Sequence, residues 1–344
     1  MPTKDSVFMS AVRTFCVVLA GFFAILCGFF LLSAAFFSPK VLPLQATPSD
    51  VIIYPDEHGN RALLSESTPV ILRLNIHGVI GQGNLSQEKV EGMLLDARNG
   101  TLRKGRLKAI ILHINSPGGI AEDSFGIYAA LKELKEELSI PLYAYVEGSC
   151  MSGAMFIACA ADKIYASAAS SVGSVGVIVG PSFNVSSAME KYGVASKTIT
   201  QGKDKDMLNP YRPWKENEGQ SITTLVEALY DQFVAVVTTN RPKISEAMLR
   251  DTLGANVFIS YEAEKLGYID VAGVPYHKAL HDLAETAKLN QYQVLRIRPP
   301  VNLYESVFGK GESGNGAQVD HVVHFGKKWG EALQGRNLFY YDQN

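Results

Sequence analysis

The amino-acid sequence predicts an α/β fold with a mainly parallel sheet, preceded by one helix that can span a membrane. From residue 69 onward, short apolar runs rich in β-branched residues alternate with helical patterns, which is typical of βαβ units. Residues 15–37 are uncharged and almost wholly apolar. The chain has 344 residues, of which 47% are hydrophobic, so it can build one large domain or two small ones with a core.

The apolar segment 15–37 is long enough to cross a bilayer. As a helix it reaches about 35 Å, and the hydrocarbon core is about 30 Å thick. A cleaved signal peptide is the alternative, but its apolar part normally has only about 7 to 15 residues. We therefore expect a short cytoplasmic segment over 1–14 and a transmembrane anchor over 15–37. Lys4 and Arg13 before the segment, against Lys40 after it, favour a cytoplasmic N-terminus and a bulk of the chain outside the cytoplasm.

The stretch 38–68 is rich in Pro, Ser, Asp and Glu and has no sustained period, so it is expected to be a juxtamembrane tether. A folded domain is expected over 69–295, and a partly flexible tail over 296–344. Within these segments, strands are predicted at 70–76, 107–114 and 141–146, helices at 121–138, 214–239 and 325–333, and a glycine-rich loop at 309–318.

Charge and cysteine usage exclude several classes of protein. A net charge of -2 gives no basic face for nucleic acid. Two of the four cysteines, Cys16 and Cys27, lie in the apolar segment, and Cys150 and Cys159 have no CxxC spacing. We expect no metal, no cofactor and no disulfide framework, and we interpret Cys150 and Cys159 as small packing residues.

Ser152 is the candidate nucleophile. It lies in a segment of small residues between an apolar strand and a short helix, where free backbone N–H groups and the positive end of the helix dipole could stabilise an oxyanion. Small residues at this place also act simply as helix N-caps, and Ser149 could do the same. The turn of Pro117, Gly118 and Gly119 after a buried strand can bring further N–H groups to this point.

A serine hydroxyl needs an adjacent base, which is commonly histidine and in some hydrolases lysine. None of the seven histidines has a clear triad signature, and His113 lies inside an apolar strand, as a core or near-site residue does. Lys203 and Lys205 are the lysine candidates, although local sequence does not separate them and both suit a solvated loop. A lysine base must be kept neutral by burial, so Asp204 and Asp206 must be engaged elsewhere.

Several motifs occur in an order that resembles peptidase family S49, which includes the signal peptide peptidase A and SohB-like proteases of bacteria. The resemblance covers about 70–270. It rests on Asn-Ser-Pro-Gly-Gly at 115–119, the nucleophile segment 151–154, Ala-Asp-Lys-Ile at 161–164 and the glycine-spaced segment 172–177. The segment 201–206 aligns with the family's Ser-Gly-x-x-Lys-Asp and selects Lys205 over Lys203.

The resemblance implies roles for individual residues. Ser152 is expected to be the nucleophile, Lys205 the general base, and Ser174 the residue that orients the lysine, with backbone N–H groups of Gly118 and Gly153 as the oxyanion hole. It also implies a ClpP/crotonase-like spiral of βαβ units. Departures from the family pattern are Ala154, Met155 with Phe156, and Val172, which leave the dyad intact and alter the pocket.

The implied protein is a membrane-anchored serine endopeptidase that cleaves apolar membrane-associated peptides, such as remnant signal peptides, through an acyl-enzyme. We expect it in the bacterial inner membrane with the catalytic domain on the periplasmic side. One copy of each motif is typical of the single-length form, so we expect a homo-oligomeric ring in which Ser152 of one protomer meets Lys205 of its neighbour.

Two other functions remain compatible with the sequence. One is a catalytically silent membrane scaffold of the same fold. The other is a crotonase-like acyl-CoA enzyme, which uses paired backbone N–H groups on the same kind of spiral, although no basic site for the phosphates of CoA is evident.

Overall fold

A computed structural model describes residues 5–36, 50–65, 67–100, 102 and 105–298. The chain divides into two compact units, Met1–Pro300 and Val301–Asn344. The second unit lies outside the described residues, and so do the glycine-rich loop and the helix predicted at 309–318 and 325–333.

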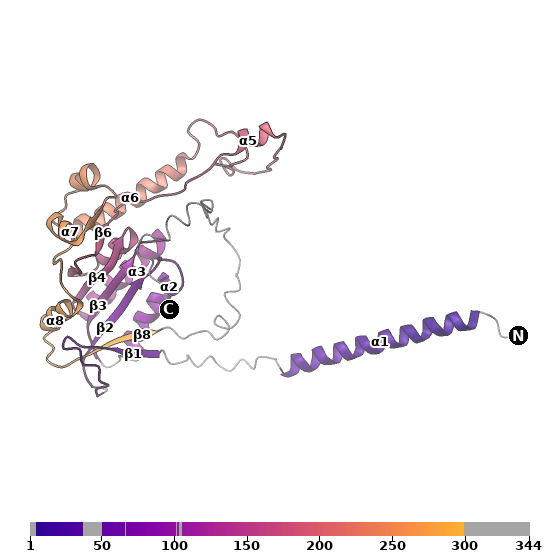
Figure 1. Ribbon diagram of the computed structural model, residues 1–344, viewed down its shortest axis with the longest axis horizontal. Helices are drawn as coiled ribbons and strands as arrows, with labels where there is room; N and C mark the ends of the chain where they lie inside the picture. Colours follow the sequence, from indigo (N-terminus) through magenta and orange to yellow (C-terminus); the bar gives the residue numbers. More distant parts are fainter. Residues whose placement is uncertain (1–4, 37–49, 66, 101, 103–104, 299–344) are drawn as a thin grey trace, which may run out of the picture. The chain divides into compact units, whose positions relative to one another are not determined.

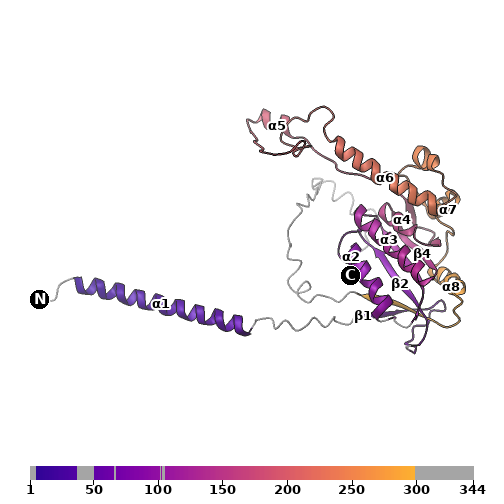
Figure 2. The same ribbon diagram turned by 180° about the vertical axis from the view of Figure 1, so that it is seen from behind.

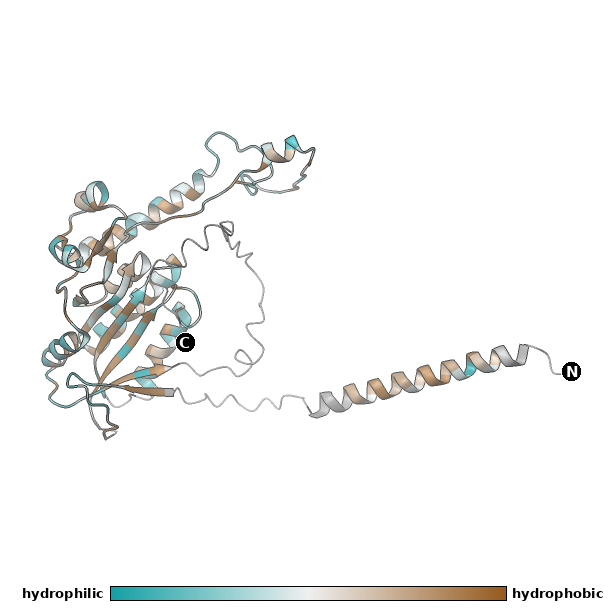
Figure 3. Ribbon diagram, in the orientation of Figure 1, coloured by the Kyte–Doolittle hydropathy of each residue, from teal (hydrophilic) through white to brown (hydrophobic). Residues whose placement is uncertain are grey.

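The first helix, α1 (Asp5–Phe36), contains residues 15–36 of the apolar segment that the sequence predicts to be helical. Its window Met9–Phe30 has a mean hydropathy of 2.1 and no buried residue. Figure 3 shows the apolar colour along most of this helix. In the described part of the chain, α1 is the one helix that is long and apolar enough to cross a membrane.

Three parallel strands form the centre of the sheet (Figure 1): β2 (Val70–His77), β3 (Leu107–Ser116) and β4 (Leu142–Met151). The strand order is β1-β8-β2-β3-β4-β6-β7, and β5 pairs with β4 off this path. The outer strands are β1 (Asp50–Tyr54), β5 (Lys163–Ala166), β6 (Ser171–Gly173), β7 (Val257–Ile259) and β8 (Gln293–Arg298).

The central strands are buried on both faces, as parallel strands covered by helices are. On one face, alternate residues such as Leu72, Leu112 and Ala144 pack against α2 (Gln87–Leu95), α3 (Ala121–Leu138) and α4 (Gly153–Ala158). These three helices lie in front of the strands in Figure 2. On the other face, Ile71, Ile111 and a group of tyrosines pack against α8 (Tyr276–Thr286).

The remaining helices follow β6 in the chain. They are α5 (Ser186–Lys191), α6 (Gln220–Asn240) and α7 (Ser260–Leu266), and single π-helical turns occur at Asp96–Gly100 and Met248–Leu253. The helix expected at 214–239 begins only at Gln220 because residues 216–219 form a turn.

Strand β4 serves two successive βαβ units. Its first half pairs with β5 through Tyr143–Val146, and its second half pairs with β6 through Ser149–Met151. The order β2-α2-β3-α3-β4-α4-β5 therefore continues into a further turn of the same fold. This arrangement confirms the predicted fold class, an α/β fold built of successive βαβ units and preceded by an N-terminal apolar helix.

The sequence predicts that the segment 38–68 is a tether. Residues 50–54 of this segment instead form the strand β1 and belong to the sheet. Their partner is β8, which pairs Asp50 with Arg298 in an antiparallel ladder. The partners are more than 200 residues apart in the chain, and β1 is only 5 residues long. Local sequence therefore carried little sign of this pairing.

Candidate active site

Ser152 stands between the end of β4 and the start of α4 in a conformation that is rare for a side chain. Its φ is 53° and its ψ is -124°. Non-glycine residues with positive φ are strained and are enriched at functional sites. Its N–H donates to the carbonyl oxygen of Gly173 at 3.0 Å, and its carbonyl oxygen accepts from the N–H of Phe156 at 3.1 Å. The backbone is thus held on both sides, and the hydroxyl makes no capping hydrogen bond.

A break in the β3–β4 ladder turns the chain toward Ser152. The register shifts between Ile114 and Ser116, and the Asn115 carboxamide oxygen accepts a hydrogen bond from the Ser149 N–H at 3.1 Å. Gly148, with a φ of 113°, has no room for a Cβ because Asn115 lies against it. The Asn115 side chain thus accepts a backbone hydrogen bond of β4 near the point where the pairing of β4 changes from β5 to β6.

Backbone amides of two segments converge next to Ser152. A Cβ on Gly118 would lie 2.7 Å from the Ser152 Cβ and 3.0 Å from the Gly153 nitrogen. Gly153 is buried at the start of α4, and the Ser124 Oγ occupies the space that its Cβ would need. The first N–H groups of a helix lack partners within the helix. The structure therefore brings together Ser152, Gly153 and Gly118.

The Gly118 N–H already has a partner, the buried Ser116 Oγ at 3.1 Å. The neighbouring Gly119 lines the cavity at Ser152. Its φ is 159°, and a Cβ there would collide with the backbone of Ile80. The sequence named the turn of Pro117, Gly118 and Gly119 as a source of N–H groups, but the family resemblance selected Gly118 and not Gly119 as the donor.

A mainly apolar cavity of about 210 Å³ opens beside Ser152. At its base the rings of Phe125 and Phe233 contact the ring of Phe156, with centroids 4.2 and 5.2 Å apart. The cavity can hold an apolar side chain next to the hydroxyl of Ser152. It is lined by Gly119, Ile120, Ala121, Ser124, Phe125, Ser152, Gly153, Phe156, Gly176, Val177, Ile178, Leu229 and Phe233.

Ser174 lies next to the candidate nucleophile. Met151 and Gly173 are paired in the β4–β6 ladder, and Ser152 and Ser174 are the residues that follow them. Ser174 also has a positive φ, 53°, and its N–H donates to the Asn256 carbonyl oxygen at 2.8 Å. β6 therefore delivers Ser174 to the same end of the sheet as Ser152.

Lys205 lies elsewhere in the described chain. It is exposed in a turn whose Met207 sulfur accepts a hydrogen bond from the Ser221 hydroxyl at 3.3 Å, so this turn lies at the N-terminal end of α6. Leu229, which lines the Ser152 cavity, follows Ser221 by eight residues, or about 12 Å along the helix axis. Lys205 does not line the cavity. A single described chain therefore does not bring Lys205 to Ser152.

Comparison with known proteins identifies the family of this chain. A profile of peptidase family S49 matches residues 134–290, which include Ser152, Ser174 and Lys205. A putative protease of Synechocystis is 30% identical over 203 residues, which cover 59% of this chain and 69% of that protein. The chain belongs to peptidase family S49.

Other relatives and a solved structure are also similar to this S49 peptidase. A putative signal peptide peptidase SppA of Enterococcus faecium is 27% identical over 285 residues, which cover 80% of this chain and 82% of the relative. A ClpP1 variant from Listeria monocytogenes has a TM-score of 0.40 at 16% identity, over 62% of this chain and 96% of that one.

Among the described residues of the S49 peptidase, no histidine lines the cavity at Ser152. His113 packs toward Tyr145 and Tyr276, on the α8 side of the sheet. Its Nδ1 lies 2.8 Å from Nε2 of His77, and its Nε2 lies 2.9 Å from a carboxylate oxygen of Glu147. Burial, together with the charge of Arg73, lowers the pKa of His113 to about 3. His113 is thus a buried neutral residue, as the sequence favoured.

The two cysteines near Ser152 are packing residues. Cys150 and Cys159 are both free and buried. Burial raises the pKa of both thiols, that of Cys159 to about 12. Because the thiolate is the reactive form, neither competes with Ser152 as a nucleophile.

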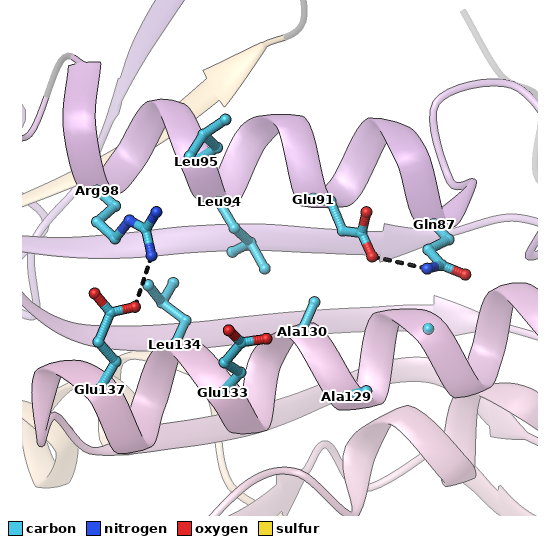
Figure 4. Close-up of a pocket in the computed structure, with 11 residues that line it drawn as sticks. Gln87, Glu91, Leu94, Leu95, Arg98, Ala129, Ala130, Glu133, Leu134 and Glu137 are labelled. Carbon is cyan, nitrogen blue, oxygen red and sulfur yellow. Dashed lines mark hydrogen bonds and ion pairs between the residues drawn. The ribbon is translucent and has the colours of Figure 1, made fainter.

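A second hollow of about 220 Å³ lies between α2 and α3 (Figure 4). Arg98 and Glu137 form an ion pair of 2.7 Å across it, and the Gln87 amide donates to Glu91 at 2.8 Å. Its lining holds no serine, cysteine, lysine or histidine. This hollow therefore lacks the serine and the lysine that the predicted dyad requires, and the cavity at Ser152 is the better candidate for the active site.

His281, Asp282 and Glu285 on α8 are the described residues best grouped for a metal ion, with potential ligand atoms within 4.8 Å of one another. Two of the three, Asp282 and His281, have other partners. The Lys278 ammonium and the Tyr165 hydroxyl donate to Asp282 at 2.7 and 2.9 Å, and Nδ1 of His281 lies 2.9 Å from Glu57. We assign no metal to this group, because Lys278 already compensates its charge.

Proposed function

We propose that the chain is a membrane-anchored serine endopeptidase with a Ser/Lys dyad. Ser152 is the nucleophile, Lys205 the general base, and Ser174 the residue that orients the lysine amine. The observation that carries the proposal is the position of Ser152, which lies on a strained strand-to-helix turn, beside free helix N–H groups and an apolar cavity.

In the first step, the Ser152 Oγ attacks the scissile carbonyl carbon while its proton passes to the neutral amine of Lys205. The tetrahedral intermediate collapses as Lys205 gives that proton to the departing amine, and an ester remains on Ser152. Water then attacks the ester, with Lys205 as base again, and releases the acid.

The developing oxyanion needs preorganised donors, and one donor of this kind contributes about 3 to 4 kcal/mol to the lowering of the barrier. Gly153 supports this role because its N–H begins a helix beside Ser152. For the second donor we favour the N–H of Gly119, because Gly119 lines the cavity. The sequence-based choice, Gly118, would first have to release Ser116.

The position of Lys205 supports a shared active site. The turn that holds Lys205 lies at the N-terminal end of α6, whereas the cavity is lined by Leu229 from the middle of that helix. We propose that the chain forms a homo-oligomeric ring in which Lys205 of one protomer reaches Ser152 of its neighbour. The segment between β6 and α6 also exposes large apolar side chains that such contacts could cover, among them Ile178, Tyr192 and Ile199, which are 84%, 78% and 85% exposed.

The proposed substrates are apolar peptides associated with the membrane, including remnant signal peptides. The apolar lining of the cavity supports this choice because a buried apolar side chain contributes about 1.5 to 3 kcal/mol to binding. We further propose that α1 spans the bacterial inner membrane as a single pass, that residues 15–37 form its anchor, and that the catalytic domain lies on the periplasmic side. On this proposal the folded domain includes β8, which extends to Arg298 and so passes the expected end at residue 295, and the tail follows.

The test is hydrolysis of a fluorogenic apolar peptide by the full chain in detergent micelles. We expect wild-type activity to rise with pH, and Ser152→Ala and Lys205→Ala to lose it. Lys203→Ala, which removes an exposed lysine of the same turn, is the matched control and should retain activity. A folded, oligomeric wild-type chain without cleavage would favour the silent scaffold, and turnover of an acyl-CoA without cleavage would favour the crotonase-like enzyme.

A further inference from the structure

The guanidinium group of Arg212 lies between two carboxylates of the turn that carries Lys205. Its Nε donates to Oδ2 of Asp206 at 2.9 Å, and its Nη1 donates to Oε2 of Glu218 at 2.8 Å. Its Nη2 donates to both residues, at 3.2 Å to Asp206 Oδ1 and at 2.9 Å to Glu218 Oε1. Such planar, two-pronged contacts are the strong form of an arginine–carboxylate pair.

The same groups also hold the backbone of the turn. Nη2 of Arg212 donates to the carbonyl oxygen of Asp206 at 2.9 Å. The Glu218 carboxylate, whose side chain is only 6% exposed, accepts the N–H groups of Leu208 and Lys215. Residues on both sides of Lys205 need this support, because Asp204 and Leu208 have positive φ values of 57° and 56°.

We infer that Arg212 is a positioning residue for the reaction, which holds the turn of Lys205 in shape and neutralises the carboxylate beside that lysine. This inference rests on the proposed role of Lys205 as base. An uncompensated carboxylate at position 206 favours the charged form of a neighbouring amine, and a charged amine cannot accept the proton of Ser152. Arg212 compensates the charge of the Asp206 carboxylate by pairing with it, so that this charge no longer favours the protonated amine.

The test is the pH profile of kcat/KM for the apolar peptide, measured with the full chain in detergent micelles. Arg212→Gln should move the acid limb to higher pH by about one unit, which lowers the rate on that limb about tenfold. The double variant Arg212→Gln with Asp206→Asn should move the limb back, because the carboxylate is gone. Arg250→Gln is the matched control, since Arg250 also binds two carboxylates, those of Asp231 and Glu246, and should leave the limb in place.

An Arg212→Gln profile that falls at every pH without a shifted limb would overturn the inference and leave Arg212 a structural role. Asp206→Asn alone keeps Arg212 on Glu218 and should move the limb to lower pH. An acid limb that stays in place or moves to higher pH in Asp206→Asn would also overturn the inference. This test holds even where Arg212→Gln fails to fold. Full activity of Lys205→Ala would instead show that Lys205 is not the base. Failure of the proposed function can therefore be distinguished from failure of the inference about Arg212.

Discussion

The backbone N–H of Ser152 donates to the carbonyl oxygen of Gly173 at 3.0 Å, so the candidate nucleophile is a continuation of the β4–β6 ladder. The same ladder brings Ser174 next to Ser152. Two residues that are 22 positions apart in the sequence thus share one end of the sheet. Their relative position depends on β6, which has only 3 residues.

Gly173→Ala should disturb this relationship. Gly173 has a φ of 125°, and a Cβ there would lie 2.5 Å from the carbonyl oxygen of Asn256. We expect β6 to move, with a loss of about 1 to 3 kcal/mol in unfolding free energy and at least a tenfold loss of kcat. Denaturant unfolding and peptide hydrolysis measure the two effects. Gly92→Ala in α2, where a Cβ meets nothing within 4 Å, should leave kcat unchanged.

Mixing Ser152→Ala and Lys205→Ala chains tests the shared site. Each variant alone should be inactive. If the dyad forms between protomers, a mixed ring contains interfaces with an intact Ser152 on one side and an intact Lys205 on the other. We expect co-assembled chains to regain a quarter or less of the wild-type rate, on the order expected from random neighbours. Mixed rings that form and stay inactive would show that both residues must come from one chain.

Leu229→Trp should narrow the cavity at Ser152 and change its preference. Leu229 lines the cavity from α6. A larger ring there should lower kcat/KM for a peptide with phenylalanine before the scissile bond about tenfold or more, relative to one with alanine, since hydrophobic pockets discriminate by about 1 to 3 kcal/mol. Leu225→Trp, one turn earlier and outside the cavity lining, should leave this ratio unchanged. Equal ratios in both variants would place the substrate side chain elsewhere.

The buried pair of His113 and His77 should make the folded state sensitive to acid. Burial, and then the charge of Arg73, lowers the pKa of His77 to about 4 and that of His113 to about 3, with Arg296 adding to both. Below the ordinary value of about 6.5, the unfolded chain binds protons that the folded chain excludes. The unfolding free energy should therefore fall as pH drops from about 6.5 toward 3. Below the folded-state pKa values this loss is complete.

The magnitude of this loss can be measured by denaturant unfolding between pH 7 and 4. Residue 113 cannot titrate in His113→Gln. The slope of unfolding free energy against pH should therefore be smaller than in the wild type, by about 1.4 kcal/mol for each pH unit. Glu147, whose carboxylate lies 2.9 Å from His113 Nε2, is the acidic neighbour that opposes the effect. The exposed His277→Gln is the control and should keep the wild-type slope. An unchanged slope in His113→Gln would remove this histidine from the acid response.

Local pattern was sufficient for much of the fold. The helix predicted at 121–138 has those bounds in α3, and the central strands start within one residue of their predicted positions. These elements are long or strongly apolar, so their period shows in the sequence. The short strands β1 and β7 were not predicted, because each gains its stability from a distant partner. Propensity over 3 to 5 residues is too weak to reveal such strands.

The sequence by itself determined the family motifs, the candidate nucleophile segment at Ser152 and the apolar helix at the N-terminus, because each is a property of a continuous stretch of residues. Only the tertiary structure decided which groups meet. In the tertiary structure, the Gly118 N–H donates to Ser116, Gly119 lines the cavity, and Arg212 pairs with Asp206. Within one chain, Lys205 does not reach Ser152. The contacts of Ser116 and Arg212 depend on the backbone conformation of their turns, and the place of Lys205 depends on how distant segments pack. Residue order alone does not give either geometry.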